Sequence, residues 1–252
     1  MADGSVKKDN LTSKTMATIE FMSREGRALP LQVISDDLSL PGATAYRILS
    51  SLRAAGYVDQ TESKYYYLTY KLLTPSGRIM ERDRFMEQML PYLNYFSLTT
   101  PCGISLTTFC EDTCVNLASV SKSIKLRAQL VVPGTAHPCH CTAAGKLFLA
   151  SLSPEGLEGW LQRNPLLPYT TRTIIQPDRL REEIRRTRER GYGIIEEEYA
   201  DGVSVLAVPV PRGRFAPPAA INFSIESKEF PQIHNGEFIQ SVRSMLNEKK
   251  VL

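Results

Sequence analysis

Long apolar segments are absent from this 252-residue sequence. No apolar run approaches the roughly 18 residues that a membrane-spanning helix requires. Residues 1–14 also lack the apolar core that follows the basic residues of a secretory signal. We therefore expect a cytoplasmic protein with no membrane partner, and a disordered tail over 1–14.

A strong excess of one charge and an even set of cysteines are also missing. The chain has 30 Lys and Arg against 27 Asp and Glu, a formal net charge of +3, which is too small to indicate a nucleic-acid partner by itself. Its five cysteines are an odd number, which argues against a disulfide framework and favours a reducing compartment. Hydrophobic residues make up 42% of a chain long enough for two domains, so we expect folded cores.

The region 15–72 has the pattern of three short helices followed by a hairpin. Apolar residues at helical spacing predict helices that begin at Thr15, Leu31 and Gly42. Two runs rich in strand-forming residues then flank a polar tip at 61–64. This outline is typical of a winged helix-turn-helix, in which the second helix of the motif enters the major groove of DNA.

The helix that begins at Gly42 would make the contacts to DNA. Its apolar positions Ala45, Ile48 and Leu52 form one stripe, so the opposite face can meet base edges and phosphates. Arg47 on that face has the donors for a bidentate contact to guanine. The same pattern also fits a module for protein contacts in which this arginine is merely solvated. The candidate DNA-binding residues are Gly42, Ala43, Thr44, Tyr46, Arg47, Ser50 and, at the hairpin tip, Lys64.

A stripe of apolar residues at heptad spacing follows, over 73–98. Ile79, Met86 and Leu93 lie seven residues apart, which predicts a linker helix that packs against a partner helix. Pro91 is expected to kink this helix. We therefore expect the protein to form a homodimer or homotetramer.

The remaining residues, 99–252, alternate predicted strands and helices, which is typical of an α/β or α+β domain built around an antiparallel sheet. Near the end, Asn222 and Ser224 alternate with apolar residues and so share one face of a strand. That pattern fits a ligand-lined sheet, and it equally fits a strand half exposed to solvent. The whole chain is predicted to be multidomain α+β.

Several blocks of sequence follow one another in a distinctive order along most of the chain. They are 40–52, Gly56–Val58, Tyr67–Thr69, His140–Lys146, Tyr192–Gly193, Glu196–Tyr199, Gly202–Val203 and Ala207–Val210. Together these blocks resemble the IclR-type bacterial transcription regulators. The resemblance implies a winged helix-turn-helix that binds operator DNA, and a GAF-like α/β effector domain that binds a small molecule, often a carboxylate. It implies no cofactor and no enzymatic activity.

The resemblance also implies where the effector would bind. Small residues that open a helix leave backbone N–H groups free, and such a helix N-terminus favours an anion. The family often has an acidic residue at Ile195 and a cysteine at Val205, so this pocket is expected to be more apolar and to suit an organic or aromatic acid better than a small oxo-acid. The implied effector-binding residues are Ala143, Ala144, Gly145, Ile195, Val205, Asn222 and Ser224.

One cluster supports a different hypothesis. Cys139, His140 and Cys141 are metal-ligand types, with His137 nearby, and an alternative function is therefore a metal- or thiol-dependent sensor or enzyme. Their near-adjacent spacing fits no standard zinc pattern, so we expect no metal. The acidic run 196–198 is expected to be a solvated loop, because consecutive carboxylates do not converge on one point.

Overall fold

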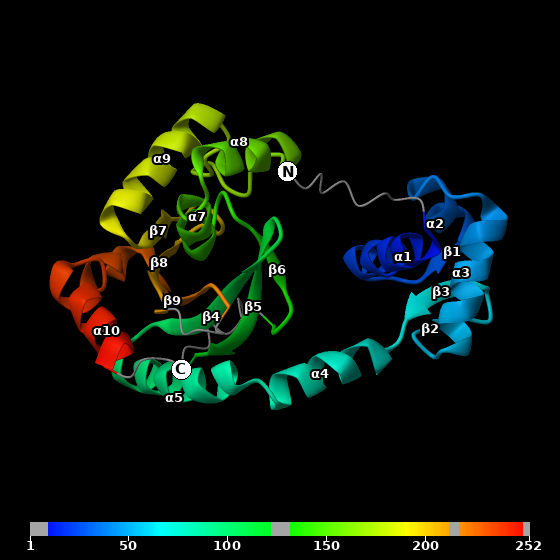
Figure 1. Ribbon diagram of the computed structural model, residues 1–252, viewed down its shortest axis with the longest axis horizontal. Coiled ribbons are helices and arrows are strands. Elements are labelled where there is room, and N and C mark those ends of the chain that lie inside the picture. The colour runs from blue at the N-terminus through cyan, green and yellow to red at the C-terminus, as the bar shows by residue number, and fades with distance from the viewer. Residues whose placement is uncertain (1–9, 122–131, 212–216, 249–252) are drawn as a thin grey trace. The chain divides into compact units, whose positions relative to one another are not determined.

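The computed structural model describes residues 10–121, 132–211 and 217–248. The chain divides between Asp83 and Arg84 into two compact units, in agreement with the predicted multidomain α+β fold (Figure 1). Among the described residues, no helix is both long and apolar enough to cross a membrane.

The first unit combines helices with a small antiparallel sheet in the strand order β1-β3-β2. A turn follows α2, and α3 follows the turn, as in a helix-turn-helix. The hairpin β2–β3 forms the wing. The elements are α1 (Leu11–Glu25), β1 (Leu29–Pro30), α2 (Leu31–Asp37), α3 (Gly42–Ala54), β2 (Val58–Gln60), β3 (Tyr65–Leu68), a 3-10 turn (Tyr70–Leu72) and α4 (Leu73–Glu81).

The start of α1 corrects one expectation. The side chain of Asn10 accepts a hydrogen bond from the backbone N–H of Ser13, and this N-cap starts the helix at Leu11. Residues 11–14 are therefore helical, although the sequence placed them in a disordered tail. The rest of that expected tail, 1–9, lies outside the described residues.

The core of the first unit explains how the helices hold α3 in place. Phe21 of α1, Ile34 of α2 and Leu49 of α3 are all buried together with Val58 and Tyr66 of the hairpin. The stripe predicted on α3 is buried as expected, so the other face of that helix is turned outward.

The predicted linker helix is wrong in two respects. The helix stops at Glu81 and a second one, α5 (Arg84–Thr99), begins after a break, while Pro91 lies inside α5. Met86 and Leu93 are buried within the second unit itself, because α5 packs on strands of its sheet. The heptad spacing in α5 therefore belongs to a domain core rather than to a partner helix, and only Ile79 of the three predicted positions is exposed.

The second unit is built on a six-stranded antiparallel sheet in the order β6-β5-β4-β9-β8-β7. Helices α7, α8 and α9 lie on one side of this sheet, and α5 and α10 on the other (Figure 1). Its elements after α5 are β4 (Gly103–Cys110), β5 (Thr113–Val120), β6 (Ala136–Pro138), α7 (Ala143–Ala150), α8 (Pro154–Arg163), α9 (Pro177–Arg190), β7 (Gly193–Glu196), β8 (Val203–Pro209), β9 (Ala219–Glu226), a 3-10 segment (Ser227–Gln232) and α10 (Gly236–Glu248).

Strand β9 shows why the two faces of the sheet differ. Phe223 makes edge-on ring contacts with Phe96 of α5 and Phe238 of α10, with ring centroids 5.2 and 5.1 Å apart. Asn222 and Ser224 point the other way, because successive side chains of a strand alternate. One face of the sheet thus carries an aromatic core, and the opposite face carries polar groups beneath α7.

Two glycines set the position of α7. A Cβ atom on Gly193 of β7 would collide with the backbone carbonyl of Ala143, and one on Gly145 would collide with the backbone of Cys139. The first turn of α7 therefore lies directly against β7 and against the segment that precedes the helix. This close approach fixes the wall of the cavity described below.

Candidate functional site

The outward face of α3 carries the residues expected to contact DNA. Gly42, Ala43 and Arg47 are exposed, and Tyr46 is 57% exposed. Thr44 and Ser50, at the edges of this face, are half-buried. The structure thus brings the predicted residues of α3 together on one surface.

Lys64 lies on the wing rather than on α3. It is exposed and closes the turn between β2 and β3 in a left-handed backbone conformation, with φ of 63°. Its backbone N–H donates to the carbonyl of Thr61 at 2.9 Å, which fixes the shape of the tip. The ammonium group is therefore presented at the end of a hairpin, as the sequence predicted.

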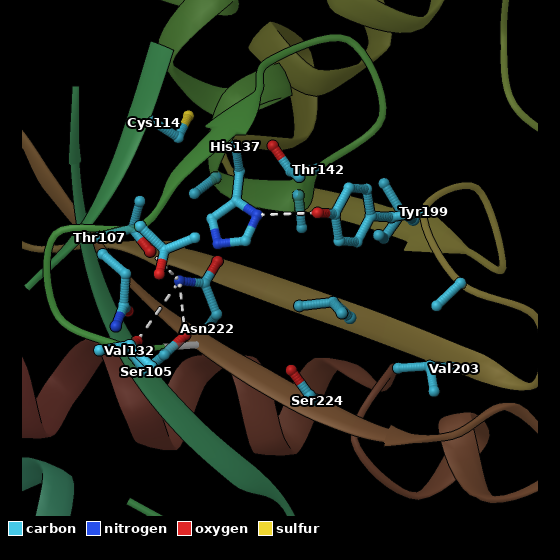
Figure 2. Close-up of a pocket in the computed structure, with 17 residues that line it drawn as sticks. Ser105, Thr107, Cys114, Val132, His137, Thr142, Tyr199, Val203, Asn222 and Ser224 are labelled. Carbon is cyan, nitrogen blue, oxygen red and sulfur yellow. Dashed lines mark hydrogen bonds between the residues drawn. The ribbon is translucent and has the colours of Figure 1, made fainter. Parts of the chain in front are cut away.

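A cavity of about 410 Å³ lies in the second unit between the sheet and the start of α7 (Figure 2). This volume falls in the range of small-molecule sites. All six strands of the sheet, the turn after β7 and the start of α7 contribute to its wall. The lining residues are Ser105, Thr107, Cys114, Asn116, Val132, Thr135, His137, Thr142, Ala143, Ala144, Ile195, Tyr199, Ala200, Val203, Val205, Asn222 and Ser224.

Most of the residues implied for effector binding line this cavity. They are Ala143, Ala144, Ile195, Val205, Asn222 and Ser224. Gly145 does not line it: its Cα faces Cys139 and the Thr142 hydroxyl, which leaves no room for a ligand there. Sequence similarity located the helix start correctly but could not tell a packing glycine from a lining residue.

Asn222 organises the polar side of the cavity. Its Nδ2 donates to the hydroxyl of Thr107 at 2.8 Å and to the hydroxyl of Ser105 at 3.2 Å, both on the neighbouring strand β4 (Figure 2). These bonds hold the side chain in place, and its Oδ1 remains as an acceptor toward the cavity. The hydroxyl of Ser224 lies two residues along the same strand.

His137 and Tyr199 are functional candidates that the sequence did not assign to the effector site. The hydroxyl of Tyr199 and Nδ1 of His137 lie 3.1 Å apart and share a hydrogen bond, although the residues are far apart in sequence. Burial lowers the pKa of His137 below its usual range, and burial raises the pKa of Tyr199. Neither shows a periodic signal, so only the fold places them together.

The Cys139–Cys141 cluster has structural contacts instead of a shared binding site. His140 Nε2 bonds the carbonyl of Leu167 at 3.0 Å, while the thiol of Cys139 lies 3.4 Å from that of Cys114. Burial raises the pKa of Cys141 to about 12, so this thiol stays protonated and poorly nucleophilic. Within the described parts of the chain, no three His, Cys, Asp or Glu side chains converge on a possible metal position.

The acidic run at 196–198 was predicted to be solvated, and this is wrong for Glu198. The carboxylate of Glu198 is buried and accepts a short hydrogen bond from Nζ of Lys146, whose side chain is 1% exposed. Glu183 lies 3.8 Å from the same Nζ and is also paired with Arg190. Burial raises the pKa of Glu198, and Lys146 opposes that shift. The tight turn after β7 directs Glu198 into the interior. The run of three acidic residues in the sequence does not indicate this turn.

Family models of known proteins match both units of this fold. Residues 78–248 match the model described as bacterial transcriptional regulator IclR C-terminal. Residues 12–62 match the IclR helix-turn-helix domain. The chain belongs to the IclR family. It is therefore a DNA-binding transcriptional regulator with an effector domain, and not an enzyme.

Individual members of the IclR family are related to this regulator along most of their length. The protein named "Probable transcriptional regulator SauR" of Cupriavidus necator is 28% identical over 238 residues, which cover 91% of each chain. The transcriptional repressor IclR of Escherichia coli is 25% identical over 217 residues, covering 84% of this chain and 78% of the repressor.

Solved structures of IclR-family proteins have the same fold. An IclR homologue of Microbacterium hydrocarbonoxydans, solved in complex with 4-hydroxybenzoate, aligns with a TM-score of 0.70 at 19% identity, covering 94% of this chain and 96% of that chain. At this identity the comparison bears on the fold alone. It confirms the predicted fold, in which a helix-turn-helix unit is followed by an α/β unit.

Proposed function

We propose that this regulator binds operator DNA through α3 and the wing, and that a carboxylic acid with an apolar or aromatic body changes its affinity for that DNA by filling the cavity of the second unit. In this proposal DNA contacts come from Gly42, Ala43, Thr44, Tyr46, Arg47, Ser50 and Lys64. The effector contacts Ala143, Ala144, Ile195, Val205, Asn222 and Ser224.

The composition of the cavity wall carries the proposal about the effector. Ile195 on β7 and Val205 on β8 offer apolar surface, while Asn222 and Ser224 on β9 offer neutral hydrogen-bonding groups, and Val205 is the cross-strand partner of Ser224. A ligand with one polar end and one apolar end would satisfy both parts. A solved relative bound to 4-hydroxybenzoate, an aromatic acid, supports this ligand class.

The DNA part of the proposal rests on the exposed face of α3. The guanidinium of Arg47 can pair with guanine or phosphate, and the Tyr46 hydroxyl can donate to phosphate oxygens. Lys64 on the wing would reach the adjacent backbone. Binding of this kind is salt-dependent, because each phosphate that is neutralised releases counterions.

We further propose that the protein acts as a homodimer. Helix α4 has no buried residue, and its apolar side chains Leu73 and Ile79 are 64% and 67% exposed. Two copies of α4 could cover these side chains, and a dimer would place two α3 helices on two half-sites of an operator. Sedimentation of the full chain, with Ile79→Lys as the disrupting variant, measures the oligomeric state.

A ligand screen tests the proposed effector class. Calorimetry of the full chain is carried out with 4-hydroxybenzoate, benzoate, pyruvate and glyoxylate, and fluorescence anisotropy then follows DNA from upstream of the gene with and without each acid. We expect the aromatic acids to bind and to change DNA affinity. Val203→Phe, which fills cavity space, should abolish acid binding and leave DNA binding intact. Tight binding of pyruvate or glyoxylate without the aromatic acids would contradict the proposal.

A further inference from the structure

One nitrogen in the wall of the cavity has no hydrogen-bond partner among the residues that the structure describes. This atom is Nε2 of His137, which is buried, while Nδ1 of the same ring is held by the Tyr199 hydroxyl at 3.1 Å. Figure 2 shows the imidazole extending from β6 into the cavity, between Tyr199 and the wall that carries Asn222. A buried polar atom without a partner is costly, so such an atom aimed into a cavity marks a place where a ligand group fits.

The packing around the ring leaves it little choice of orientation. His137 is the cross-strand partner of Cys114 on β5, and its ring meets the Tyr199 ring edge-on with centroids 5.4 Å apart. The ring of Tyr169 lies against that of Tyr199, tilted by 38° with the centroids 5.1 Å apart, and limits the movement of that phenol. The imidazole is therefore fixed with Nδ1 toward Tyr199 and Nε2 toward the cavity.

The titratable groups that face this ring are few. The titratable residues that line the cavity with it are Cys114 on β5 and Tyr199 in the turn after β7, while Thr142, which precedes α7, and Asn222 on β9 are neutral. Among the described residues that line the cavity, none is Asp, Glu, Lys or Arg. Burial lowers the pKa of His137 below its usual range, which favours the neutral form of the ring at neutral pH.

We infer that His137 is the residue that recognises the acidic group of the effector, and that it takes up a proton from solvent as the acid binds. This inference rests on the proposed function and adds to it the residue that distinguishes an acid from a neutral analogue. In the resulting imidazolium both ring nitrogens carry hydrogen. Nε2 then donates to the effector carboxylate, and Nδ1 donates to the hydroxyl oxygen of Tyr199.

The electrostatics of a buried carboxylate give the reason. A charged carboxylate loses its hydration on entering a cavity with an apolar wall. The free energy lost in this way is offset best by an opposite charge that also makes a direct hydrogen bond. Tyr199 can accept as well as donate, so it keeps its bond to Nδ1 in both protonation states. His137 can therefore gain charge without losing its existing partner.

Calorimetry in two buffers with different ionisation enthalpies measures this proton directly. The probes are 4-hydroxybenzoate and its neutral amide, 4-hydroxybenzamide. Near neutral pH we expect the acid to bind with uptake of about one proton, and its affinity to fall by up to about tenfold per pH unit as the pH rises from about 6.5 to about 8. We expect the amide to bind with no proton uptake and no pH dependence in the same range.

Variants identify the group that takes the proton. His137→Gln keeps a hydrogen-bonding side chain but cannot become charged. It should therefore abolish the proton uptake and lower the affinity for the acid by about tenfold or more, with little effect on the affinity for the amide. Tyr199→Phe should lower the affinity for the acid by a smaller factor and should keep the proton uptake. His234→Gln, a histidine outside the cavity, is the matched control and should behave as the wild type. DNA binding and thermal unfolding of each variant report its folding.

The outcomes separate this inference from the proposed function. If the acid binds without proton uptake, or equally well to His137→Gln, the role of His137 is wrong while the aromatic effector stands. If neither the acid nor the amide binds, the aromatic effector is wrong and the inference falls with it. The buffer comparison on the wild type decides the first case even if a variant fails to fold.

Discussion

The two units of this regulator present their binding residues in different ways. In the first unit, six of the seven candidate DNA contacts follow one another along the single helix α3, and neighbouring elements only hold that helix in place. In the second unit, the cavity wall comes from strands, turns and a helix spread between Ser105 and Ser224. A surface site can thus belong to a single element, whereas an enclosed site is formed only when several elements pack together.

The largest expected effect comes from the buried ion pair in the second unit. Lys146→Met leaves Glu198 as a buried charge without its partner, so the free energy of unfolding of this unit should fall by about 3–5 kcal/mol. The single tryptophan, Trp160, is buried in the same unit, so urea titration followed by its fluorescence measures this change. Lys228→Met, which removes an exposed ion pair, is the control.

Hydrogen exchange measured by mass spectrometry shows whether Lys146→Met destabilises the second unit alone. Peptides of α1, α2 and α3 should keep their wild-type protection, because the first unit has its own core. Equal loss of protection in both units would show that they unfold together and would contradict the division. Replacement of Glu198 by Gln in the Lys146→Met background should restore part of the lost stability.

A second change disturbs the cavity through packing instead of charge. Gly193→Ala forces a methyl group into the carbonyl of Ala143, so we expect a loss of about 1–3 kcal/mol in the stability of the second unit and weaker binding of aromatic acids. Gly236→Ala is the matched control, because nothing lies within 4 Å of the added methyl group. Unchanged stability of Gly193→Ala would mean that α7 is not held against β7 in solution.

The corresponding change in the first unit should affect binding and not stability. Arg47→Ala is expected to weaken operator binding by about 1–3 kcal/mol and to reduce the slope of affinity against salt, because an exposed side chain is removed from the face of α3. Anisotropy with labelled DNA measures both. Arg24→Ala removes an exposed arginine from α1 and should bind as the wild type; an equal loss there would point to general charge and not to α3.

The smallest expected effect is a pH dependence confined to the second unit. Burial lowers the pKa of His137 and of His140, so below about pH 6.5 these two histidines bind more protons in the unfolded chain than in the folded one. Stability should therefore fall as the pH falls, by at most about 1.4 kcal/mol per pH unit for each histidine. All three histidines lie in the second unit, so the first unit should not share this slope.

Urea midpoints at several pH values, followed by Trp160 fluorescence, measure this slope. His137→Gln should flatten it and His234→Gln should not. A slope that His137→Gln leaves unchanged would mean that this histidine has the same pKa in the folded and unfolded chains.

Periodic patterns in the sequence predicted the features that belong to single elements. The stripe of α3 gave the outward face that carries Arg47, because a helix repeats every 3.6 residues wherever it packs. The alternation on β9 placed Asn222 and Ser224 on one face for the same kind of reason. Patterns failed where the neighbours of an element matter: Met86 and Leu93 fit a partner helix by spacing, yet they pack on their own sheet.

The sequence alone determined that a helix-turn-helix unit precedes an α/β unit, and it identified six of the residues that line the cavity, since these follow from local periodicity and from likeness to a family. Only the tertiary structure decided that Lys146 meets Glu198 and that His137 meets Tyr199 with one nitrogen left free. These pairs are 52 and 62 residues apart in sequence. Contacts over such separations depend on how the β7 turn and α7 pack against the sheet, and that packing is set by close contacts in three dimensions.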